Sequence, residues 1–391
     1  MGGASASTEL PAAAACVVIG TGVLGSSAAA SLARRLGDQV LVLEQFEPGH
    51  RRGSSSDHSR IIRHSYHSPV YTKLTRAMFA SWEAAERASG TRLVVRTGGL
   101  DLGDPQVTSS VADLESSAAA MSEAGIAFER LTADEVRRRW PQWHLPDDVT
   151  ALFQEDAGIL DVGRACTVQL ELARAHGARL RTRVRVERLE DRGGEVAVHT
   201  DAGVILAGHV VACTGKWTAR LLAGLHPLPL RHTSEQVTYV ASRDLAAFAP
   251  DRFPIWIRLG DPCFYGFPVY GEAAVKIAQD LGGPEVEPDD EEGVVDPVRV
   301  TKVTDFLAKH LPGAAGPVAH SRSCLYDLTP DRDLVVGPLP DHPRILVTAG
   351  AGHAAKFGAL FGDVLADLVC DGATAHPVEP LSAGRPALRQ G

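Results

Sequence analysis

Cys324 stands in the segment SRSCLYDLTPDRD (321–333), where its neighbours offer several kinds of chemistry. Two hydroxyl residues that flank an arginine precede it, and Tyr326 and a Thr-Pro-Asp turn follow it. A cysteine in such a place can pack in the core, attack as a thiolate, bind a metal ion or carry a covalently attached group. Packing is the ordinary case, and the neighbouring residues alone do not exclude the other three roles.

Basic residues near both ends of the chain could bind an anion. Arg60 and Arg63 lie in GSSSDHSRIIRHSY (53–66), and they would share a face if this segment were helical. A solvated basic loop explains either arginine alone more simply. Lys356 follows a predicted strand and lies near the start of a predicted helix. The positive end of the helix dipole disfavours a cation there, which favours an anionic ligand beside it.

Lys276 interrupts an apolar segment, AAVKIAQD (273–280), that is typical of an interior strand. A lysine on the inward face of a strand must find a partner or lose its proton, and such groups cluster at functional sites. An outward-facing lysine on an alternating strand would have the same spacing. The chain has only six lysines, at positions 73, 216, 276, 302, 309 and 356.

A glycine-rich turn, GTGVLG, contains Gly20, Gly22 and Gly25 and joins a predicted strand to a predicted helix. Such glycines permit a tight turn and close approach to a pyrophosphate, whose charge meets the free N–H groups of the helix. Glu44 ends the next strand, where a carboxylate can accept both ribose hydroxyls of an adenosine. The pattern predicts dinucleotide binding, and it does not separate NAD from FAD. Gly215, after the apolar segment HVVAC, is either a further contact with FAD or the end of an ordinary core strand.

The elements that must position these residues follow an α/β pattern. Buried strands are predicted at 16–20, 39–46, 209–215 and 344–353, and helices at 21–37, 70–88, 132–140, 163–176 and 217–225. Thr132 and Glu135 have the spacing of a capping box. The alternating segments RLRTRVRVERLE, EVAVHT and GVILAG (179–208) predict antiparallel strands. Residues 234–280 are strand-rich and aromatic, and an acidic loop (284–297) separates them from a helix over 298–311.

Length and composition limit the class of protein. A chain of 391 residues is long enough for two domains, and a net charge of −9 argues against nucleic acid and anionic membranes as partners. The six cysteines are scattered without a CxxC pair, so neither a zinc site nor a disulfide framework is expected, and a reducing cytoplasm fits. No run of about eighteen apolar residues and no signal-peptide pattern is found.

Six motifs together resemble the monomeric sarcosine oxidase family, which includes N-methyltryptophan oxidase, pipecolate oxidase and flavin oxidases that act on cyclic imino acids in antibiotic pathways. The resemblance covers nearly the whole chain and rests on the joint order of GTGVLG with Glu44, GSSSDHSRIIRHSY, FYGFPVYGEAAVKIAQD, SCLYDLTPDRD, GAGHAAKFG and GRPAL. It implies an α/β fold with an FAD-binding Rossmann-type, glutathione-reductase-like domain (1–90, 151–225 and 325–391). A sheet-rich α+β substrate domain (91–150 and 226–324) is implied beside it.

The resemblance also implies roles for individual residues. FAD is expected to be covalent, through a thioether from Cys324 to the flavin 8α-methyl group. Arg63 and Lys356 match the pair that binds the substrate carboxylate, and Lys276 matches the lysine that assists the reduction of O₂. Arg60 matches an arginine close to the flavin. The expected cofactor-binding residues are Gly20, Gly22, Gly25, Glu44, Ser59, Gly215, Cys324 and Gly352.

Departures from the family pattern bear on the substrate. Asp280 stands where sarcosine oxidases have a histidine, as does Ser56, and Asp327 stands where they have a threonine. The acid at 280 resembles the cyclic imino-acid oxidases, whereas His353 resembles the sarcosine oxidases. A larger or cyclic secondary amino acid is therefore at least as well supported as sarcosine. Asp280, Lys276 and Arg60 are the expected catalytic residues. The expected substrate-binding residues are Arg63, Lys356, Tyr265, Tyr326, Trp256 and His353.

The predicted function is an FAD-dependent oxidase that acts on a secondary amino acid and passes electrons to O₂. Its expected partners are this small-molecule substrate and O₂, with no metal, nucleic acid or membrane, and a cytoplasmic monomer is expected. One alternative is a flavin-dependent dehydrogenase of imino or amino acids, and another is a biosynthetic oxidase of a larger cyclic substrate. A non-catalytic flavoprotein would leave the set of Cys324, Lys276, Arg63 and Lys356 without a purpose. An NAD-dependent dehydrogenase would leave the cysteine and the C-terminal motifs unexplained.

Overall fold

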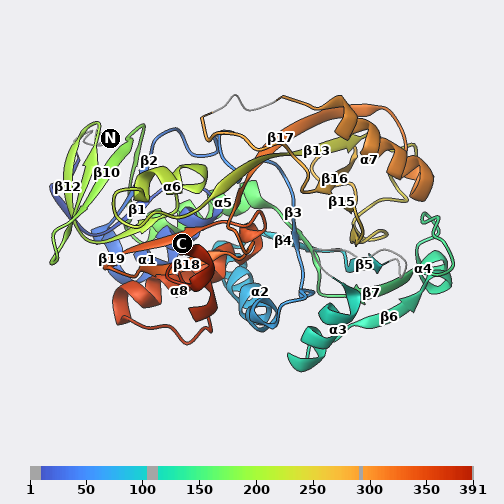
Figure 1. The fold of residues 1–391 in the computed structure, drawn as a ribbon, viewed down its shortest axis with the longest axis horizontal. Helices are drawn as coiled ribbons and strands as arrows, with labels where there is room; N and C mark the ends of the chain where they lie inside the picture. Colours follow the sequence, from blue (N-terminus) through green and yellow to red (C-terminus); the bar gives the residue numbers. More distant parts are fainter. Residues whose placement is uncertain (1–9, 104–112, 290–293, 390–391) are drawn as a thin grey trace.

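The computed structural model describes residues 10–103, 113–289 and 294–389, and within them two large sheets dominate the fold (Figure 1). In the first sheet β12 is central: it runs parallel to β1 on one edge and to β19 on the other, and β2 and β9 continue the parallel order beyond β1. Its described strands are β1 Ala13–Ile19, β2 Val40–Glu44, β9 Arg179–Thr182, β10 Val186–Asp191, β11 Val196–Thr200, β12 Gly203–Ala212, β18 Val335–Leu339 and β19 His342–Ala349.

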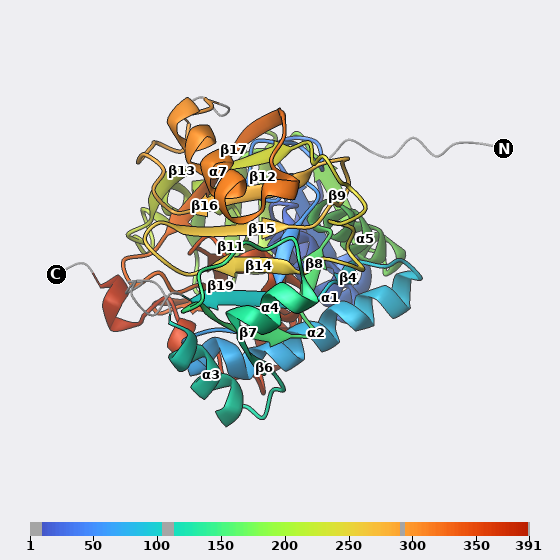
Figure 2. The ribbon, with the colours of Figure 1, turned by 90° about the vertical axis from the view of Figure 1, so that its right-hand side faces the viewer.

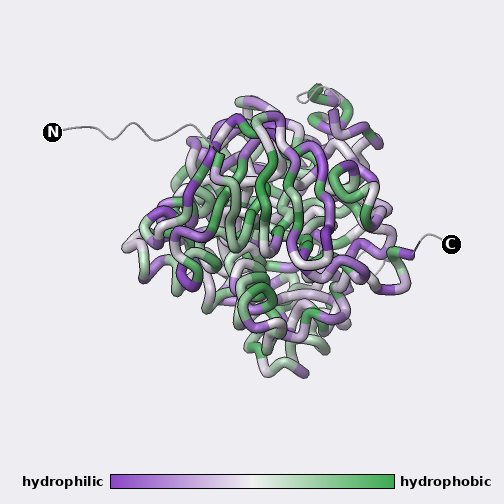
Figure 3. Tube along the Cα trace, turned by 90° about the vertical axis from the view of Figure 1, so that its left-hand side faces the viewer, coloured by the Kyte–Doolittle hydropathy of each residue, from purple (hydrophilic) through white to green (hydrophobic). Residues whose placement is uncertain are grey.

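The strands β1 and β2 are buried because apolar residues fill both of their faces. Val18 packs under the helices, whereas Val17 contacts the cluster on the opposite face of the sheet. Figure 3 shows these hydrophobic strands side by side, with hydrophilic residues in many of the connections. A sheet covered on both faces is the usual setting of parallel strands.

Helix α1 (Val23–Leu36) lies between α5 (Val162–Ala175) and α8 (Gly358–Asp371) and packs on both. Its buried residues 26–31 are all alanine or serine, so its neighbours approach closely. Helix α2 (Pro69–Ser89) packs against α8 and α5 and extends toward the second sheet (Figure 1). The other described helices are α3 Leu114–Glu123, α4 Ala133–Arg139, α6 Thr218–Leu222, α7 Pro297–His310 and the 3₁₀ turns η1 Gly37–Gln39, η2 Gly215–Trp217, η3 Pro312–Ala314, η4 Ala354–Phe357, η5 Glu379–Leu381 and η6 Pro386–Leu388.

The second sheet runs in the order β17-β13-β16-β15-β14-β5-β7-β6, with α7 on one side of it (Figure 2). Phe306 of α7 stacks on Trp256 and contacts Phe264, which fixes the helix to the sheet. Its described strands are β5 Gly99–Gly103, β6 Glu129–Thr132, β7 Thr150–Gln154, β13 Arg231–Val240, β14 Ile255–Arg258, β15 Cys263–Phe267, β16 Val275–Asp280 and β17 Val318–Leu328. A small third sheet joins β3 Arg60–Ile62, β8 Gly158–Leu160 and β4 Val94–Arg96.

Most predicted elements are present, including the capping box of α4, in which Thr132 and Glu135 bond reciprocally. Two predictions near 179–215 are wrong in detail. The segment 179–190 is two strands, because Arg183 adopts a positive φ of 59° and turns the chain. Its first half, β9, joins β2 in parallel, whereas β10 to β12 are antiparallel as predicted. The predicted segments 203–208 and 209–215 merge into the single strand β12.

A helix over the arginine segment 53–66 is not found. Residues 60–62 form β3, which pairs with β8 and buries Ile62, so Arg60 and Arg63 do not share a helical face. In the part of the chain that the structure describes, no helix is long and apolar enough to cross a bilayer. The two sheets are compatible with the predicted division into two domains, whose boundaries stay a prediction.

Candidate active site

A cavity of about 1330 Å³ lies between the two large sheets. One wall is formed by the carboxyl ends of β1, β2, β12 and β19, where ligands bind in parallel α/β sheets. The other wall is formed by β15, β16 and β17 of the second sheet. The volume exceeds the roughly 300–1,000 Å³ of ordinary small-molecule pockets, and so it has room for a large cofactor with a substrate.

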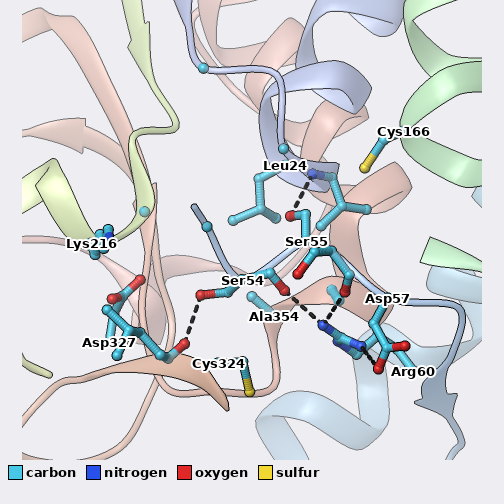
Figure 4. Close-up of a pocket in the computed structure, with 18 of the residues that line it drawn as sticks. Leu24, Ser54, Ser55, Asp57, Arg60, Cys166, Lys216, Cys324, Asp327 and Ala354 are labelled. Atoms are coloured by element: carbon cyan, nitrogen blue, oxygen red, sulfur yellow. Dashed lines mark hydrogen bonds and ion pairs between the residues drawn. The ribbon is translucent and has the colours of Figure 1, made fainter. Parts of the chain in front are cut away.

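The glycine turn forms one end of this cavity. Gly20 has a φ of 100°, and a Cβ there would lie 2.4 Å from the carbonyl oxygen of Cys213 on the neighbouring strand, so only glycine fits. Gly22 caps α1 without a side-chain bond and lines the cavity, while Gly25 lies one turn into the helix, is buried and does not line it. The Ser55 hydroxyl accepts a hydrogen bond of 3.0 Å from Val23 N at the helix start (Figure 4).

Glu44 lies beside this turn at the end of β2. One oxygen of its carboxylate accepts hydrogen bonds from the backbone N (2.9 Å) and hydroxyl (2.8 Å) of Thr21, and the other accepts one from Phe46 N (3.0 Å). Burial favours a raised pKa for Glu44, but bonds from His50, Phe46 and Thr21 outweigh it and lower the pKa, so the group is an anion. A glycine turn, a helix start and a buried carboxylate in one wall fit the adenosine and pyrophosphate of a dinucleotide such as FAD. Gly215 begins η2 and lines the same wall.

Arg60 organises the loop that separates β2 from β3. Its guanidinium donates hydrogen bonds to the backbone carbonyls of Ser59 (2.8 Å), Ser54 (2.9 Å) and Ser56 (2.8 Å), as Figure 4 shows in part. Ser54 in turn donates to the carbonyl of Leu325 on β17 (2.6 Å). The arginine therefore holds the serine-rich loop against the strand that carries Cys324.

Lys276 faces inward from β16 and is only 3% exposed. Its ammonium donates to the Asp57 carboxylate at 2.6 Å and to the carbonyl and hydroxyl of Ser59 at 3.0 and 3.2 Å. Burial lowers the pKa of Lys276 to about 8, and Asp57 opposes that shift. The inward orientation excludes the outward-facing lysine that the alternating pattern left open.

Cys324 lies on β17 with a free thiol that lines the cavity. Burial raises the pKa of this thiol, and the nearby cations Arg60 and Lys276 oppose the rise. Tyr326 and Tyr265 line the same wall. Gly352 lies against Tyr326: its φ is 76°, and a Cβ would come within 2.4 Å of the ring, so a glycine is required beside this tyrosine.

Arg63 and Lys356 are two cations of the cavity wall. Arg63 bonds the Asp101 carboxylate at 3.0 Å and the Ser65 hydroxyl at 3.0 Å. Lys356 is 7% exposed and donates to the carbonyl of His353 at 3.1 Å. Burial and then the charge of Arg63 lower the pKa of Lys356 to about 7, with Asp280 acting in the opposite direction. The pair of Arg63 and Lys356, called the clamp below, therefore has less negative charge around it than its two cations would balance.

Asp280 and His353 also line the cavity. Burial raises the pKa of Asp280, while Arg332, Arg63 and Lys356 act to lower it. Burial, followed by the charge of Lys356, holds the pKa of His353 well below its usual value, so the imidazole is neutral. A neutral imidazole and an acid of raised pKa are both suited to contact an amine.

The structure does not bring Trp256 to the cavity. Its side chain is 2% exposed and packs edge-on against Trp143 and face-on against Phe306, in the core below α7. The next residue, Ile257, lines the cavity instead. The prediction failed because β14 is buried on both faces, so burial and an aromatic side chain do not tell which face carries the substrate.

Two acids of the site were missed by reasoning from the sequence: Asp57, which lines the cavity, and Asp101, which bonds the cavity residue Arg63. Asp57 had a weak signal, since it is an acid in a serine-rich loop three positions before Arg60. Asp101 had none, because it lies 38 positions from Arg63. Within the described residues, no group of three or more His, Cys, Asp or Glu side chains could hold a metal ion.

Comparisons with known proteins show the family of this chain. The family model described as FAD dependent oxidoreductase matches residues 15–368. Monomeric sarcosine oxidase from Streptomyces avermitilis is 32% identical over 370 residues, 93% of this chain and 95% of the relative. N-methyl-L-tryptophan oxidase from Salmonella arizonae is 30% identical over 376 residues, 94% of this chain and 98% of the relative. The open form of NikD, an unusual amino acid oxidase essential for nikkomycin biosynthesis, has a TM-score of 0.84 and 29% identity over 95% of this chain and 98% of that chain. The chain is therefore a member of the FAD-dependent oxidoreductase family, with the sarcosine and N-methyltryptophan oxidases among its relatives, as its motifs predict.

Proposed function

We propose that this chain is an oxidase of a secondary amino acid with an N-methyl or cyclic amine. The substrate loses a hydride from carbon and a proton from nitrogen to give an imine, and O₂ takes up two electrons and two protons to give H₂O₂. One observation carries the proposal: a single cavity is lined by two cations, Arg63 and Lys356, by an acid, Asp280, and by Lys276 and Cys324.

Arg63 and Lys356 bind the substrate carboxylate in this proposal. Burial and then the repulsion from Arg63 lower the pKa of Lys356 to about 7. A carboxylate between them relieves the repulsion and forms charge-assisted hydrogen bonds with both. Asp101 holds Arg63 from behind at 3.0 Å, which orients the guanidinium before the substrate arrives.

Asp280 contacts the substrate nitrogen. Its carboxyl lies in the same cavity as the clamp, and burial makes its anionic form costly unless a cation approaches. A protonated amine meets that condition, and Asp280 can then take the proton that must leave nitrogen before the imine forms.

Bound FAD supplies the acceptor for the hydride equivalent. We propose that Cys324 is its covalent attachment point, because its free thiol lines the cavity and the cations Arg60 and Lys276 act against the rise in its pKa that burial causes. Lys276 then keeps a positive charge near the place where O₂ becomes reduced. Ser59 and Gly352 complete the expected cofactor wall, and both line the cavity.

The substrate is expected to be an N-substituted amino acid. The relatives are named for sarcosine and for N-methyl-L-tryptophan, and NikD is described as an amino acid oxidase. Asp280, in place of the histidine of the sarcosine oxidases, supports a larger or cyclic amine. The predicted cytoplasmic location and monomeric state remain predictions.

A dehydrogenase is the second candidate, and the pairing of Lys276 with Asp57 favours it. A carboxylate at 2.6 Å offsets part of the positive charge that would assist O₂. Such an enzyme would bleach the flavin with substrate, transfer electrons to a dye and release little peroxide.

The covalent attachment has a direct test. The purified protein is precipitated with acid, and flavin is measured in the pellet and in the supernatant. We expect the flavin in the pellet for the wild type and in the supernatant for Cys324→Ser. Cys166→Ser and Cys263→Ser are matched controls, because both cysteines line the cavity, and Figure 4 shows Cys166 near the start of α1, away from Cys324. Flavin in the wild-type supernatant would contradict the tether.

The reaction is tested by peroxide release from a panel of N-methyl and cyclic amino acids, each beside its amide, which lacks the carboxylate. We expect peroxide with at least one amino acid and a strong loss with its amide. Dye reduction without peroxide would favour the dehydrogenase. If no member of the panel gives either peroxide or dye reduction, the proposed function is contradicted.

A further inference from the structure

Asp57 is a buried acid in the cavity wall whose backbone is unusual. It lies in the loop between β2 and β3, its side chain is 7% exposed, and its φ is 91°. A positive φ is uncommon for a residue other than glycine and costs free energy, so it persists where surrounding contacts enforce it. The contacts of its carboxylate therefore matter more than the local backbone preference.

The first contact is with Lys276. An ammonium group has three N–H donors, and here each has an acceptor: Asp57 Oδ2, the carbonyl of Ser59 and the hydroxyl of Ser59. Only the carboxylate carries a full negative charge. Asp57 therefore fixes the position of the ammonium and also balances its charge.

The second oxygen of Asp57 is held just as firmly. Oδ1 accepts hydrogen bonds from the hydroxyl of Tyr239 and from the backbone N of His58 (2.8 Å), and Arg322 lies 3.5 Å from it. Arg60 lies 3.7 Å from Oδ2. A carboxylate among three cations and two neutral donors stays ionised, although burial alone would raise its pKa.

We propose that Asp57 is a positioning residue that keeps the Lys276 ammonium charged and fixed at the cavity wall. Its effect on the reaction of O₂ rests on the proposed function, whereas its effect on the charge of Lys276 does not. Among the described residues that bond the ammonium, none can replace it, since Ser59 offers only neutral oxygens.

The groups around Lys276 decide what happens when the carboxylate is removed. Burial lowers the pKa of Lys276, Asp57 raises it, Arg60 lowers it and Cys324 raises it, with a net value of about 8. The remaining groups that face the ammonium are Tyr239 of β13, Phe267 of β15 and, beyond Asp57, Arg322 of β17 with its partner Glu272. Without Asp57, burial and Arg60 both lower the pKa of Lys276. Because a close opposite charge shifts a pKa by about one to three units, the pKa of Lys276 should fall by that amount. Lys276 would then be largely neutral at pH 7.5.

The test measures the titration of Lys276 itself. The holoenzyme is labelled with lysine carrying ¹³C at Cε, whose chemical shift follows the protonation of the amine. The chain has six lysines, so the spectrum has few signals, and Lys276→Met assigns the one of interest. We expect a midpoint near pH 8 in the wild type. In Asp57→Asn it should fall by about one pH unit or more.

Three variants separate charge from shape. Asp57→Glu restores the charge and should return the midpoint toward the wild-type value. Asp57→Gly removes the charge while it suits the positive φ, so it serves if Asp57→Asn does not fold, and its midpoint should fall in the same way. Glu272→Gln removes a carboxylate of the same cluster that pairs with Arg322 at 3.0 Å, and it should leave the midpoint unchanged. An unchanged midpoint in both folded Asp57→Asn and Asp57→Gly would overturn the proposal.

A second readout links the charge to the reaction. The recovery of flavin absorbance in air should decline as the pH rises through about 8 in the wild type, because Lys276 loses its proton there. In Asp57→Asn the decline should occur at lower pH. A shifted NMR midpoint without peroxide formation would sustain the role of Asp57 and contradict the oxidase. Peroxide formation with an unshifted midpoint would support the oxidase and contradict the role of Asp57.

Discussion

Two buried lysines line the same cavity, and their surroundings differ. Lys276 is 3% exposed and has three acceptors, one of which is the Asp57 carboxylate. Lys356 is 7% exposed, and in the described part of the chain its one acceptor is the carbonyl of His353. After burial, the largest effect on its pKa comes from another cation, Arg63. The described part of the protein therefore supplies acceptors for all three donors of the Lys276 ammonium but for only one donor of the Lys356 ammonium.

The difference separates two kinds of work that a buried cation can do. A lysine whose donors are all occupied can influence a reaction only through its charge, from a fixed position. A lysine with unused donors beside a second cation is destabilised until an anion arrives, and so it binds ligand. We therefore propose that Lys356 binds the substrate and that Lys276 acts through its charge in the reaction with O₂. The predictions below test this division.

The largest effect is expected from Arg63→Met, on the ligand-binding side. Its partner Asp101 is buried, with a side chain 3% exposed, and it would lose its cation. Breaking a buried ion pair from one side costs about 3–5 kcal/mol, which should appear in the free energy of unfolding from denaturant titration. Arg63→Met/Asp101→Asn should recover much of this stability without recovering substrate binding. A single variant as stable as the wild type would show that Asp101 does not depend on Arg63.

Lys356→Met should lower kcat/KM for a carboxylate substrate by about 100-fold, because one charge-assisted bond to the carboxylate is lost. Its stability should be equal or higher, because a buried cation with few partners is removed. Lys302, one of two exposed lysines of α7, provides a matched control in Lys302→Met, which should change neither quantity. Steady-state kinetics and thermal unfolding measure both. An unchanged kcat/KM would remove Lys356 from the carboxylate clamp.

The same lysine predicts a pH dependence. Burial and Arg63 lower the pKa of Lys356 to about 7 against the effect of Asp280, so the cation is present below pH 7 and is lost as the pH rises through that value. The kcat/KM of the free enzyme should therefore gain a declining limb above about pH 7. In Lys356→Arg that limb should disappear, since arginine stays protonated. Superimposable profiles for the two proteins would count against this pKa.

Ser59→Ala should have the smallest effect, on the Lys276 side. It removes the hydroxyl acceptor at 3.2 Å and leaves the carboxylate and the carbonyl in place. The free energy of unfolding should fall by about 1 kcal/mol. The recovery of flavin absorbance in air should stay close to the wild-type rate, because the charge of Lys276 is retained. A collapse of that rate would mean that Ser59, rather than the Asp57 charge, controls Lys276.

The sequence predicted the parts of the site that rest on local patterns. The turn at Gly20, the buried strand before it and Glu44 after it depend on neighbours in the chain, and the structure has each of them. The inward face of Lys276 could be anticipated only as one of two orientations. The prediction of the site residues became specific only through the family resemblance, which joined motifs that lie far apart in the sequence.

The parts that were missed depend on contacts between distant residues. Asp57 and Lys276 are 219 positions apart, and no periodicity links them. Trp256 was placed in the cavity wrongly, because β14 is buried on both faces and its aromatic side chain packs under α7. The segment at Arg60 forms a strand rather than a helix, because pairing with β8 decides its conformation. Tertiary pairing, and not local propensity, sets these features.

The central claim is that the two lysines serve different half-reactions, and stopped-flow absorbance of the flavin tests it most directly. Substrate is mixed with each protein without air to follow bleaching, and the bleached protein is then mixed with O₂ to follow recovery. Lys356→Met should slow bleaching at low substrate concentration and leave recovery near the wild-type rate. Lys276→Met should slow recovery by about 100-fold or more and leave bleaching nearly unchanged. Equal slowing of both steps in both variants would contradict the division of work between Lys276 and Lys356.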